Sequence, residues 1–144
     1  MRIADVLRSK GSTTVETVRP QATVQQLVDE LVEHNIGATV VSDDGEQVLG
    51  IVSERDVVRL LRDGRAPLDT IVADVMTTEV HVCEPEDSLE DVMRLMTDQR
   101  IRHVPVVTNG RLAGLVSIGD AVKARMSELE FERDQLTTYV TGAQ

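Results

Sequence analysis

The chain contains an internal repeat, and this repeat restricts the folds that it can adopt. Three segments recur in the same order at a nearly constant separation: Asp5-Val6-Leu7 and Asp74-Val75-Met76, Pro20–Val24 and Pro85–Leu89, and Gly50–Ser53 and Gly114–Ser117. A repeat of this kind indicates two copies of one structural unit. We therefore expect a first domain at residues 1–65, a second at 66–125 and a helical tail at 126–144.

Each copy shows the same predicted order of elements: a short lead-in helix, then strand, helix, strand, strand and helix. Thr23 and Ser88 are suited to cap helices whose apolar residues recur at helical spacing. Asn109-Gly110, between two apolar runs, predicts a tight hairpin, and Asp43-Asp44-Gly45 predicts a turn in the first copy. The expected strands are Ala38–Val41, Val48–Val52, Val104–Val107 and Leu112–Val116, with helices starting at Ser53 and Ser117.

A three-stranded sheet with two helices on one face cannot bury both of its faces alone. The prediction is thus an α+β fold in which two such units pack face to face with pseudo-twofold symmetry. Gly64, Ala66 and Pro67 mark the linker between them.

Composition narrows the possible functions. The net charge of −10 disfavours nucleic acid as the main partner, because an acidic surface repels phosphate backbones. Phe131 and Tyr139 are the only aromatic residues, so a bound base would lie between aliphatic side chains. Cys83 is the only cysteine, which excludes an internal disulfide and fits a reducing cytoplasm. The sequence shows no signal-peptide core and no long apolar run, so we expect neither membrane insertion nor secretion.

Each copy ends in the pattern Gly-apolar-apolar-Ser-x-x-Asp. The first copy reads Gly50-Ile51-Val52-Ser53-Glu54-Arg55-Asp56, and the second reads Gly114-Leu115-Val116-Ser117-Ile118-Gly119-Asp120. The second copy also carries Ile101–Val106, with the sequence Ile-Arg-His-Val-Pro-Val, on the preceding strand. These motifs resemble those of the CBS (cystathionine beta-synthase) domain, and the tandem pair resembles a stand-alone Bateman module. The resemblance implies a regulatory protein that binds adenine nucleotides (AMP, ADP, ATP or NAD(H)) and forms a homodimer.

Two interpretations of the Ser-x-x-Asp motifs remain open. The serine and aspartate could form capping boxes that only start helices. Alternatively, the helix N-terminus and the serine hydroxyl could bind phosphate. The resemblance places Ser53 and Ser117 near phosphate or ribose, and Asp56 and Asp120 on ribose.

Arg55, Arg102 and His103 are the candidate phosphate cations, and the guanidinium group of an arginine can grip phosphate in a fork. Each could instead be an ordinary surface side chain. The resemblance adds Val80, Ile101 and Pro105 to the candidate nucleotide-binding residues.

The first copy has Gly37–Val40 where the second has Arg102–Pro105, so it lacks the cationic pair. We therefore expect two unequal clefts, for example one for a mononucleotide and one for a larger adenosine ligand such as NAD(H).

The sequence leaves three other kinds of function open. The clefts could be degenerate, which would make the chain a structural or interaction scaffold. A metal site could use His81, Cys83 and His103, although their spacing matches no zinc pattern and Cys83 suits a buried apolar position. Catalysis lacks a nucleophile–base set and a phosphate-binding Gly-Lys-Ser loop, so we expect a binding protein that is not an enzyme and has no catalytic cofactor.

The tail is predicted to be one helix from Val122 to about Val140 that continues the last helix of the second copy. Val122, Met126, Leu129, Leu136 and Val140 fall near a 3.5-residue spacing, interrupted by Arg133. We expect this helix to pack on its own module or on a partner subunit, because a lone helix gains stability mainly through packing. We expect the module to pass its signal to a separate effector protein.

Overall fold

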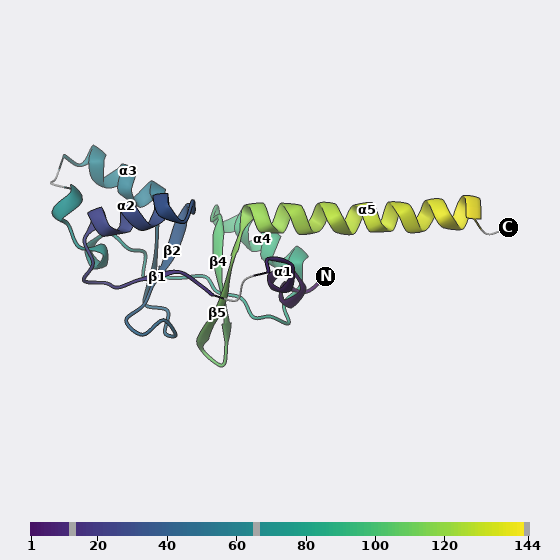
Figure 1. Cartoon of the computed structure of the whole chain (residues 1–144), viewed down its shortest axis with the longest axis horizontal. Coiled ribbons are helices and arrows are strands. Elements are labelled where there is room, and N and C mark those ends of the chain that lie inside the picture. Colours follow the sequence, from purple (N-terminus) through teal and green to yellow (C-terminus); the bar gives the residue numbers. More distant parts are fainter. Residues whose placement is uncertain (12–13, 65–66, 143–144) are drawn as a thin grey trace.

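The computed structural model describes residues 1–11, 14–64 and 67–142, and it shows two similar α+β units side by side (Figure 1). The linker residue Ala66 and the expected domain boundary at 65/66 lie outside the described residues. In chain order the elements are α1 (Ile3–Ser9), β1 (Thr17–Val18), α2 (Val24–Glu33), β2 (Ala38–Val41), β3 (Gly50–Ser53), α3 (Glu54–Arg62), two 3-10 turns (Pro67–Asp69 and Val72–Asp74), α4 (Leu89–Gln99), β4 (His103–Thr108), β5 (Arg111–Ser117) and α5 (Ile118–Gly142).

The local signals in the sequence form as predicted. The Thr23 hydroxyl accepts a hydrogen bond from the Gln26 amide at 3.2 Å and caps α2, and the Ser88 hydroxyl accepts one from Asp91 at 3.1 Å and caps α4. Asn109 and Gly110 have φ of 53° and 77° and form the two-residue turn between β4 and β5. Positive φ at both central residues matches the twist of the strands that the turn joins.

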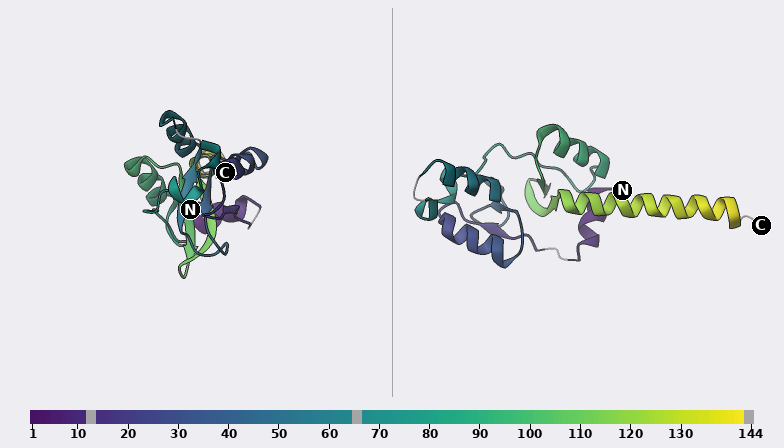
Figure 2. Two further views of the ribbon diagram at one scale, coloured as in Figure 1. Left: turned by 90° about the vertical axis from the view of Figure 1, so that its left-hand side faces the viewer. Right: turned by 90° about the horizontal axis from the view of Figure 1, so that it is seen from above.

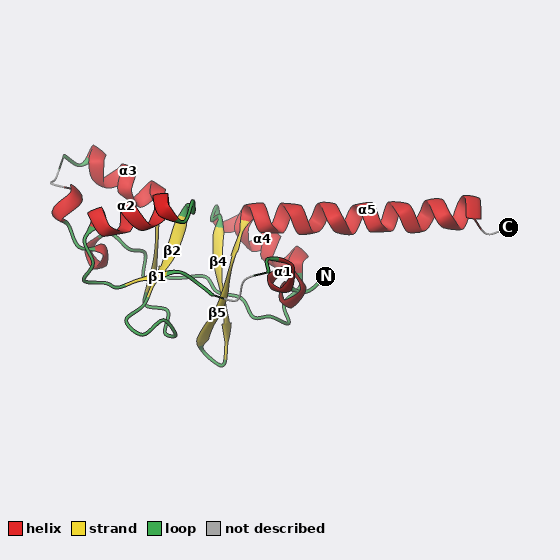
Figure 3. Cartoon of the chain, in the orientation of Figure 1, coloured by secondary structure: helices red, strands yellow, loops and turns green. Residues whose placement is uncertain are grey.

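The two sheets differ in size (Figure 3). In the first copy β1 pairs in parallel with β2, and β2 pairs antiparallel with β3. In the second copy β4 and β5 form the antiparallel pair, while the expected third strand is reduced to a single parallel bridge between Cys83 and Val106. The registers are equivalent, since Ala38 lies opposite Ser53 and His103 lies opposite Ser117.

The two lead-in helices are exchanged between the copies. Ile3 and Val6 of α1 belong to the core of the second copy, whereas Val72 of the second 3-10 turn belongs to the core of the first. Figure 1 accordingly shows α1 beside β5 and α5 although it begins the chain. Neither copy completes its core without a segment from the other.

This exchange explains the glycine that begins each motif. A Cβ on Gly50 would lie 2.7 Å from Met76 Sδ and 2.9 Å from the Thr77 carbonyl oxygen, and one on Gly114 would lie 2.7 Å from Leu7 Cδ2. Met76 and Leu7 come from the exchanged lead-in segments. Both glycines are therefore required for the close packing of a helix from elsewhere in the chain.

Helix α5 extends well beyond the body. In the right-hand view of Figure 2 it runs straight out from the second copy, and every residue from 129 to 142 is exposed. The single helix predicted for the tail is confirmed over the described residues, but residues 129–142 do not pack on the module of their own chain. Across the described residues, no helix combines the length and the apolar character needed to cross a membrane.

Candidate functional site

The first cleft lies between the two copies and has a volume of about 700 Å³. Its lining comes from β2, β3 and α3 of the first copy and from residues 77–81, 100–103 and 118 of the second. The size lies within the range of small-molecule sites. A ligand in this cleft would touch both copies at once.

On the first-copy side, Ser53 and Asp56 are held together at the start of α3. The Asp56 Oδ2 atom accepts hydrogen bonds from the Ser53 amide at 2.8 Å and from the Ser53 hydroxyl at 3.1 Å. Both bonds end on the same oxygen, so the carboxylate retains acceptor capacity through Oδ1. The capping role of this motif is confirmed, and it is compatible with ligand binding by the same carboxylate.

The cleft is locally cationic on an acidic protein. Its lining includes four arginines, Arg55, Arg59, Arg100 and Arg102, against three carboxylates, Glu54, Asp56 and Glu79. The N-terminus of α3 adds its dipole on the first-copy side. The chain as a whole carries a net charge of −10, so this cleft departs from the overall field and suits an anionic group.

His103 lines the first cleft and is half-buried. Burial lowers the pKa of its imidazole, and the nearby charges of Asp120 and Glu54 oppose this shift only in part. The lowered pKa favours the neutral form of the imidazole, and whether His103 binds phosphate stays a prediction. A neutral imidazole can still donate one hydrogen bond and accept another.

The second motif is engaged in a different way. Lys10, just after α1, lies with its Nζ 2.9 Å from Asp120 Oδ2 and donates a hydrogen bond to the Leu115 carbonyl at 2.8 Å. Ser117 and Asp120 also form a capping box, with bonds of 2.9 and 3.1 Å. Burial would raise the pKa of Asp120, but the bonds from the Ser117 amide and from Lys10 outweigh it, and the pKa is lowered.

Comparison with known proteins identifies the family. The CBS domain model matches residues 3–63 and again residues 72–127. The chain belongs to the CBS domain family. It is a tandem CBS pair, as the sequence motifs predicted.

Similar CBS proteins support this assignment along the whole chain. The mitochondrial CBS domain-containing protein CBSX3 of Arabidopsis thaliana is 39% identical over 97% of this chain and 72% of its own length. The CBS domain-containing protein YhcV of Bacillus subtilis is 36% identical over 81% of this chain and 82% of its own. A crystal structure of a CBS-domain protein from Agrobacterium tumefaciens is 43% identical, with a TM-score of 0.82 over 87% of this chain and 99% of its own.

The fold is also that of the CBS domain pair of protein MJ0100, whose crystal structure contains 5′-methylthioadenosine and S-adenosyl-L-methionine. That pair is 22% identical, with a TM-score of 0.77 over 86% of this chain and 98% of its own. At this identity the likeness concerns the fold.

The CBS pair brings seven of the ten candidate residues into one cleft. These are Ser53, Arg55, Asp56, Val80, Ile101, Arg102 and His103. Ser117 and Asp120 lie outside that lining, at the second motif. Pro105 is buried within β4, where its carbonyl accepts the Cys83 amide at 3.0 Å.

The sequence analysis missed three further residues that line the first cleft or contact the second motif. Arg59 follows Arg55 by one helical turn, a spacing that could have revealed it. Arg100 adopts a left-handed conformation at the end of α4, with φ of 55°, and Lys10 reaches the second motif from α1 across most of the chain. No feature of the neighbouring sequence predicts that Arg100 and Lys10 lie at these positions.

The metal alternative gains no support. Cys83 is buried in the core of the second CBS copy, and burial raises the pKa of its thiol to about 12. His81, by contrast, is exposed at the first cleft. Among the residues that the structure describes, no three histidine, cysteine or acidic side chains are grouped closely enough to hold a metal ion.

Proposed function

We propose that this CBS pair binds an adenine nucleotide (AMP, ADP, ATP or NAD(H)) in the first cleft and acts as a regulatory module, not as an enzyme. The observation that carries the proposal is the meeting of the Ser53–Asp56 motif of one copy with the arginine-rich edge of the other. Ribose hydroxyls and phosphate oxygens need these two kinds of partner.

In this proposal, different side chains of the cleft bind the ribose, the phosphate and the base. Asp56 accepts hydrogen bonds from the ribose hydroxyls through its available acceptor sites. Arg55, Arg102 and the positive end of the α3 dipole bind phosphate. Val80 and Ile101 flank the adenine base, since the cleft lining contains no Phe, Tyr or Trp side chain.

The charge of the cleft favours a phosphate ligand over S-adenosylmethionine. The sulfonium of S-adenosylmethionine is positive and would face the four arginines that line the cleft. MJ0100 nevertheless binds two adenosine compounds without phosphate, so both of these belong in any ligand screen.

We further propose that the two clefts are unequal. At the second motif Asp120 Oδ2 is already paired with Lys10, and this ion pair competes with a ribose hydroxyl for the carboxylate. We expect one strong site per chain, and a weaker second site whose affinity rises in Lys10→Ala. Two identical sites in a calorimetric titration of the wild type would contradict this.

Regulation follows from the position of the cleft. A ligand that contacts both copies favours the arrangement in which they are closest, and so shifts the population of conformers seen by a partner. In this proposal the chain works as a homodimer in the cytoplasm and passes the signal to a separate effector protein.

The first experiment is to purify the protein, denature it and identify any released small molecule by mass spectrometry. The chain has no tryptophan and one tyrosine, so absorbance near 260 nm also reports a carried nucleotide. A stoichiometric adenine nucleotide would support the proposal. An empty protein that shows no thermal shift with AMP, ADP, ATP, NAD, NADH or S-adenosylmethionine would favour a scaffold with degenerate clefts.

A further inference from the structure

His103 lies between the two copies and close to both Ser-x-x-Asp motifs. It belongs to β4 of the second copy, where it lies opposite Ser117 in the β4–β5 register. Its ring reaches the first copy, because a Cβ on Gly37 would lie 3.5 Å from His103 Cε1 and 3.8 Å from Glu54 Cδ. The imidazole and the Glu54 carboxylate therefore approach the same point above Gly37, next to the start of α3.

Charged groups of both copies act on this ring. Burial has the largest effect, since it disfavours the imidazolium and places the pKa of His103 below its usual value. Asp120 of the second copy and Glu54 of the first favour the charged ring, whereas Arg102 and Lys10 disfavour it. One more negative charge in the cleft would therefore shift this balance toward the imidazolium.

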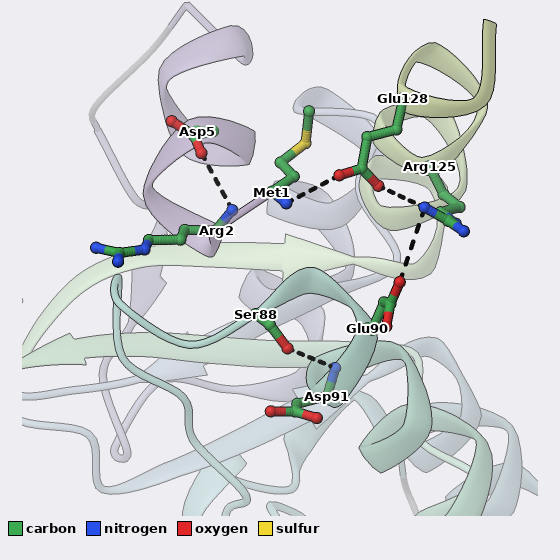
Figure 4. Close-up of polar contacts among 8 residues, drawn as sticks. All are labelled: Met1, Arg2, Asp5, Ser88, Glu90, Asp91, Arg125 and Glu128. Carbon is green, nitrogen blue, oxygen red and sulfur yellow. Dashed lines mark hydrogen bonds and ion pairs between the residues drawn. The ribbon is translucent and has the colours of Figure 1, made fainter. Parts of the chain in front are cut away.

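The cleft side chains next to His103 are available to a ligand. Elsewhere on the protein, charged side chains pair with each other; Arg125, for example, lies 2.8 Å from Glu128 at the base of α5 (Figure 4). Across the part of the chain that the structure describes, Glu54 and Arg102 form no ion pair, and the His103 ring forms no hydrogen bond. A phosphate in the cleft would thus act on a ring whose two nitrogens are both available.

We propose that phosphate enters the first cleft together with a proton from solvent, which His103 takes up. The unbound cleft then holds a neutral ring, and the bound cleft holds an imidazolium near the phosphate and Glu54. The inference rests on the nucleotide binding proposed above and adds its regulation. Affinity for a phosphorylated ligand rises as the pH falls, whereas affinity for adenosine does not.

The same ring connects the first cleft to the second motif. Asp120 Oδ2 lies 2.9 Å from Lys10 Nζ, so the ammonium cancels part of the attraction between this carboxylate and a charged His103. Loss of the ammonium charge would strengthen that attraction, and loss of the Glu54 carboxylate would weaken the attraction from the other side. Charges at the second motif therefore set the pH at which the first cleft responds.

The first test is the Kd of AMP between about pH 5 and pH 8, measured by isothermal titration in wild type and in His103→Gln. The phosphate of AMP titrates in this range, but the ratio of the two Kd values at each pH cancels that effect. The Kd of His103→Gln relative to wild type should rise about 5- to 10-fold from the highest to the lowest pH, since one pKa unit corresponds to about tenfold in affinity. The same ratio for adenosine, which has no phosphate, should stay constant.

The two other histidines provide matched controls. His81 is exposed and lines the same cleft, whereas His34 lies outside it, 3.6 Å from Glu16. His81→Gln and His34→Gln should both keep the wild-type response of AMP affinity to pH. With three histidines in the chain, proton NMR can also follow each ring directly, and AMP should raise the titration midpoint of His103 but not that of His34.

Substitutions of the neighbouring charges test the direction of the effect. Glu54→Gln should move the response to lower pH, because it removes a charge that favours the imidazolium, and Lys10→Ala should move it to higher pH, because it removes a charge that opposes it. Glu79→Gln removes another exposed acid of the same cleft. This control should leave the pH of the response unchanged.

The outcomes separate this inference from the proposed function. AMP binding with a Kd ratio that does not change with pH would overturn the proton uptake and leave nucleotide binding to stand. A pH response that persists in His103→Gln and disappears in His81→Gln would also overturn it. If AMP, ATP and NAD all failed to bind throughout this pH range, both proposals would be wrong.

Discussion

Asp56→Ala should abolish tight nucleotide binding while barely affecting folding. In the structure Asp56 accepts two hydrogen bonds from Ser53, at 2.8 and 3.1 Å. The substitution removes a first-turn acid and these local bonds, which we expect to cost about 1 kcal/mol of unfolding free energy. If the carboxylate also accepts two ribose hydroxyls, its loss should cost roughly 3 kcal/mol of binding, or about 100-fold in Kd.

A matched control separates helix capping from ligand binding. Asp91 also follows a capping serine by three residues, at the start of α4, and it pairs with Arg94 at 3.5 Å on the surface, away from the cleft. Asp91→Ala should therefore cost about 0.5–1 kcal/mol of stability and leave the Kd unchanged. Isothermal titration with AMP, ATP and NADH gives the affinities, and urea unfolding gives the stabilities.

The reasoning would be wrong if Asp56→Ala bound nucleotide as tightly as Asp91→Ala. In that case the Ser53–Asp56 motif would serve only to start α3, and the ribose would contact other groups. Equal losses of affinity in both variants would point to a general effect on folding.

Three further predictions follow from the side chains around the site and the core. Arg102→Ala should weaken the affinity for ATP about 5- to 10-fold and leave the affinity for adenosine unchanged, because an exposed charged hydrogen bond to phosphate contributes roughly 1–1.5 kcal/mol. Arg94 lies outside the cleft, so Arg94→Ala should change neither affinity in the same titration. Because the pKa of His103 is lowered in the folded protein, the unfolded chain takes up a proton at a higher pH than the folded chain does. The free energy of unfolding should therefore fall as the pH drops below about 6.5. In His103→Gln this fall should be smaller in urea-unfolding experiments over the same pH range. Burial raises the pKa of the Cys83 thiol to about 12, so this thiol should react with a thiol reagent far more slowly in the native protein than in urea. Equal reaction rates would show that the thiol is not buried in the native protein.

Local elements could be predicted because their causes are local. Thr23 and Ser88 cap helices through bonds to residues three positions away, and Asn109-Gly110 forms its turn from the conformational freedom of two adjacent residues. The repeat itself was visible, and with it the family and the fold. The prediction of a third strand in the second copy was wrong. A strand needs hydrogen-bonded partners along its length, and the segment around Cys83 pairs with β4 at a single bridge to Val106.

The sequence indicated the individual residues of the candidate site but not which of them lie together in space. The sequence indicated Ser53, Asp56, Arg102 and His103, and the motif around each is contiguous. That Ser53 and Asp56 face Arg102 of the other copy depends on how the two sheets pack. The pKa of His103 depends on the same packing, because burial is a property of the assembled structure.

By itself the sequence determined the repeat, the capped helices, the hairpin and the candidate residues for ribose and phosphate. Only the tertiary structure decided that the lead-in helices are exchanged, that Lys10 forms an ion pair with Asp120, and that α5 projects from the second copy with its apolar residues exposed. The physical reason is the range of the interactions. Caps and turns join neighbours in the chain, whereas Lys10 and Asp120 meet across 110 positions only because two cores must share their helices to bury their apolar faces.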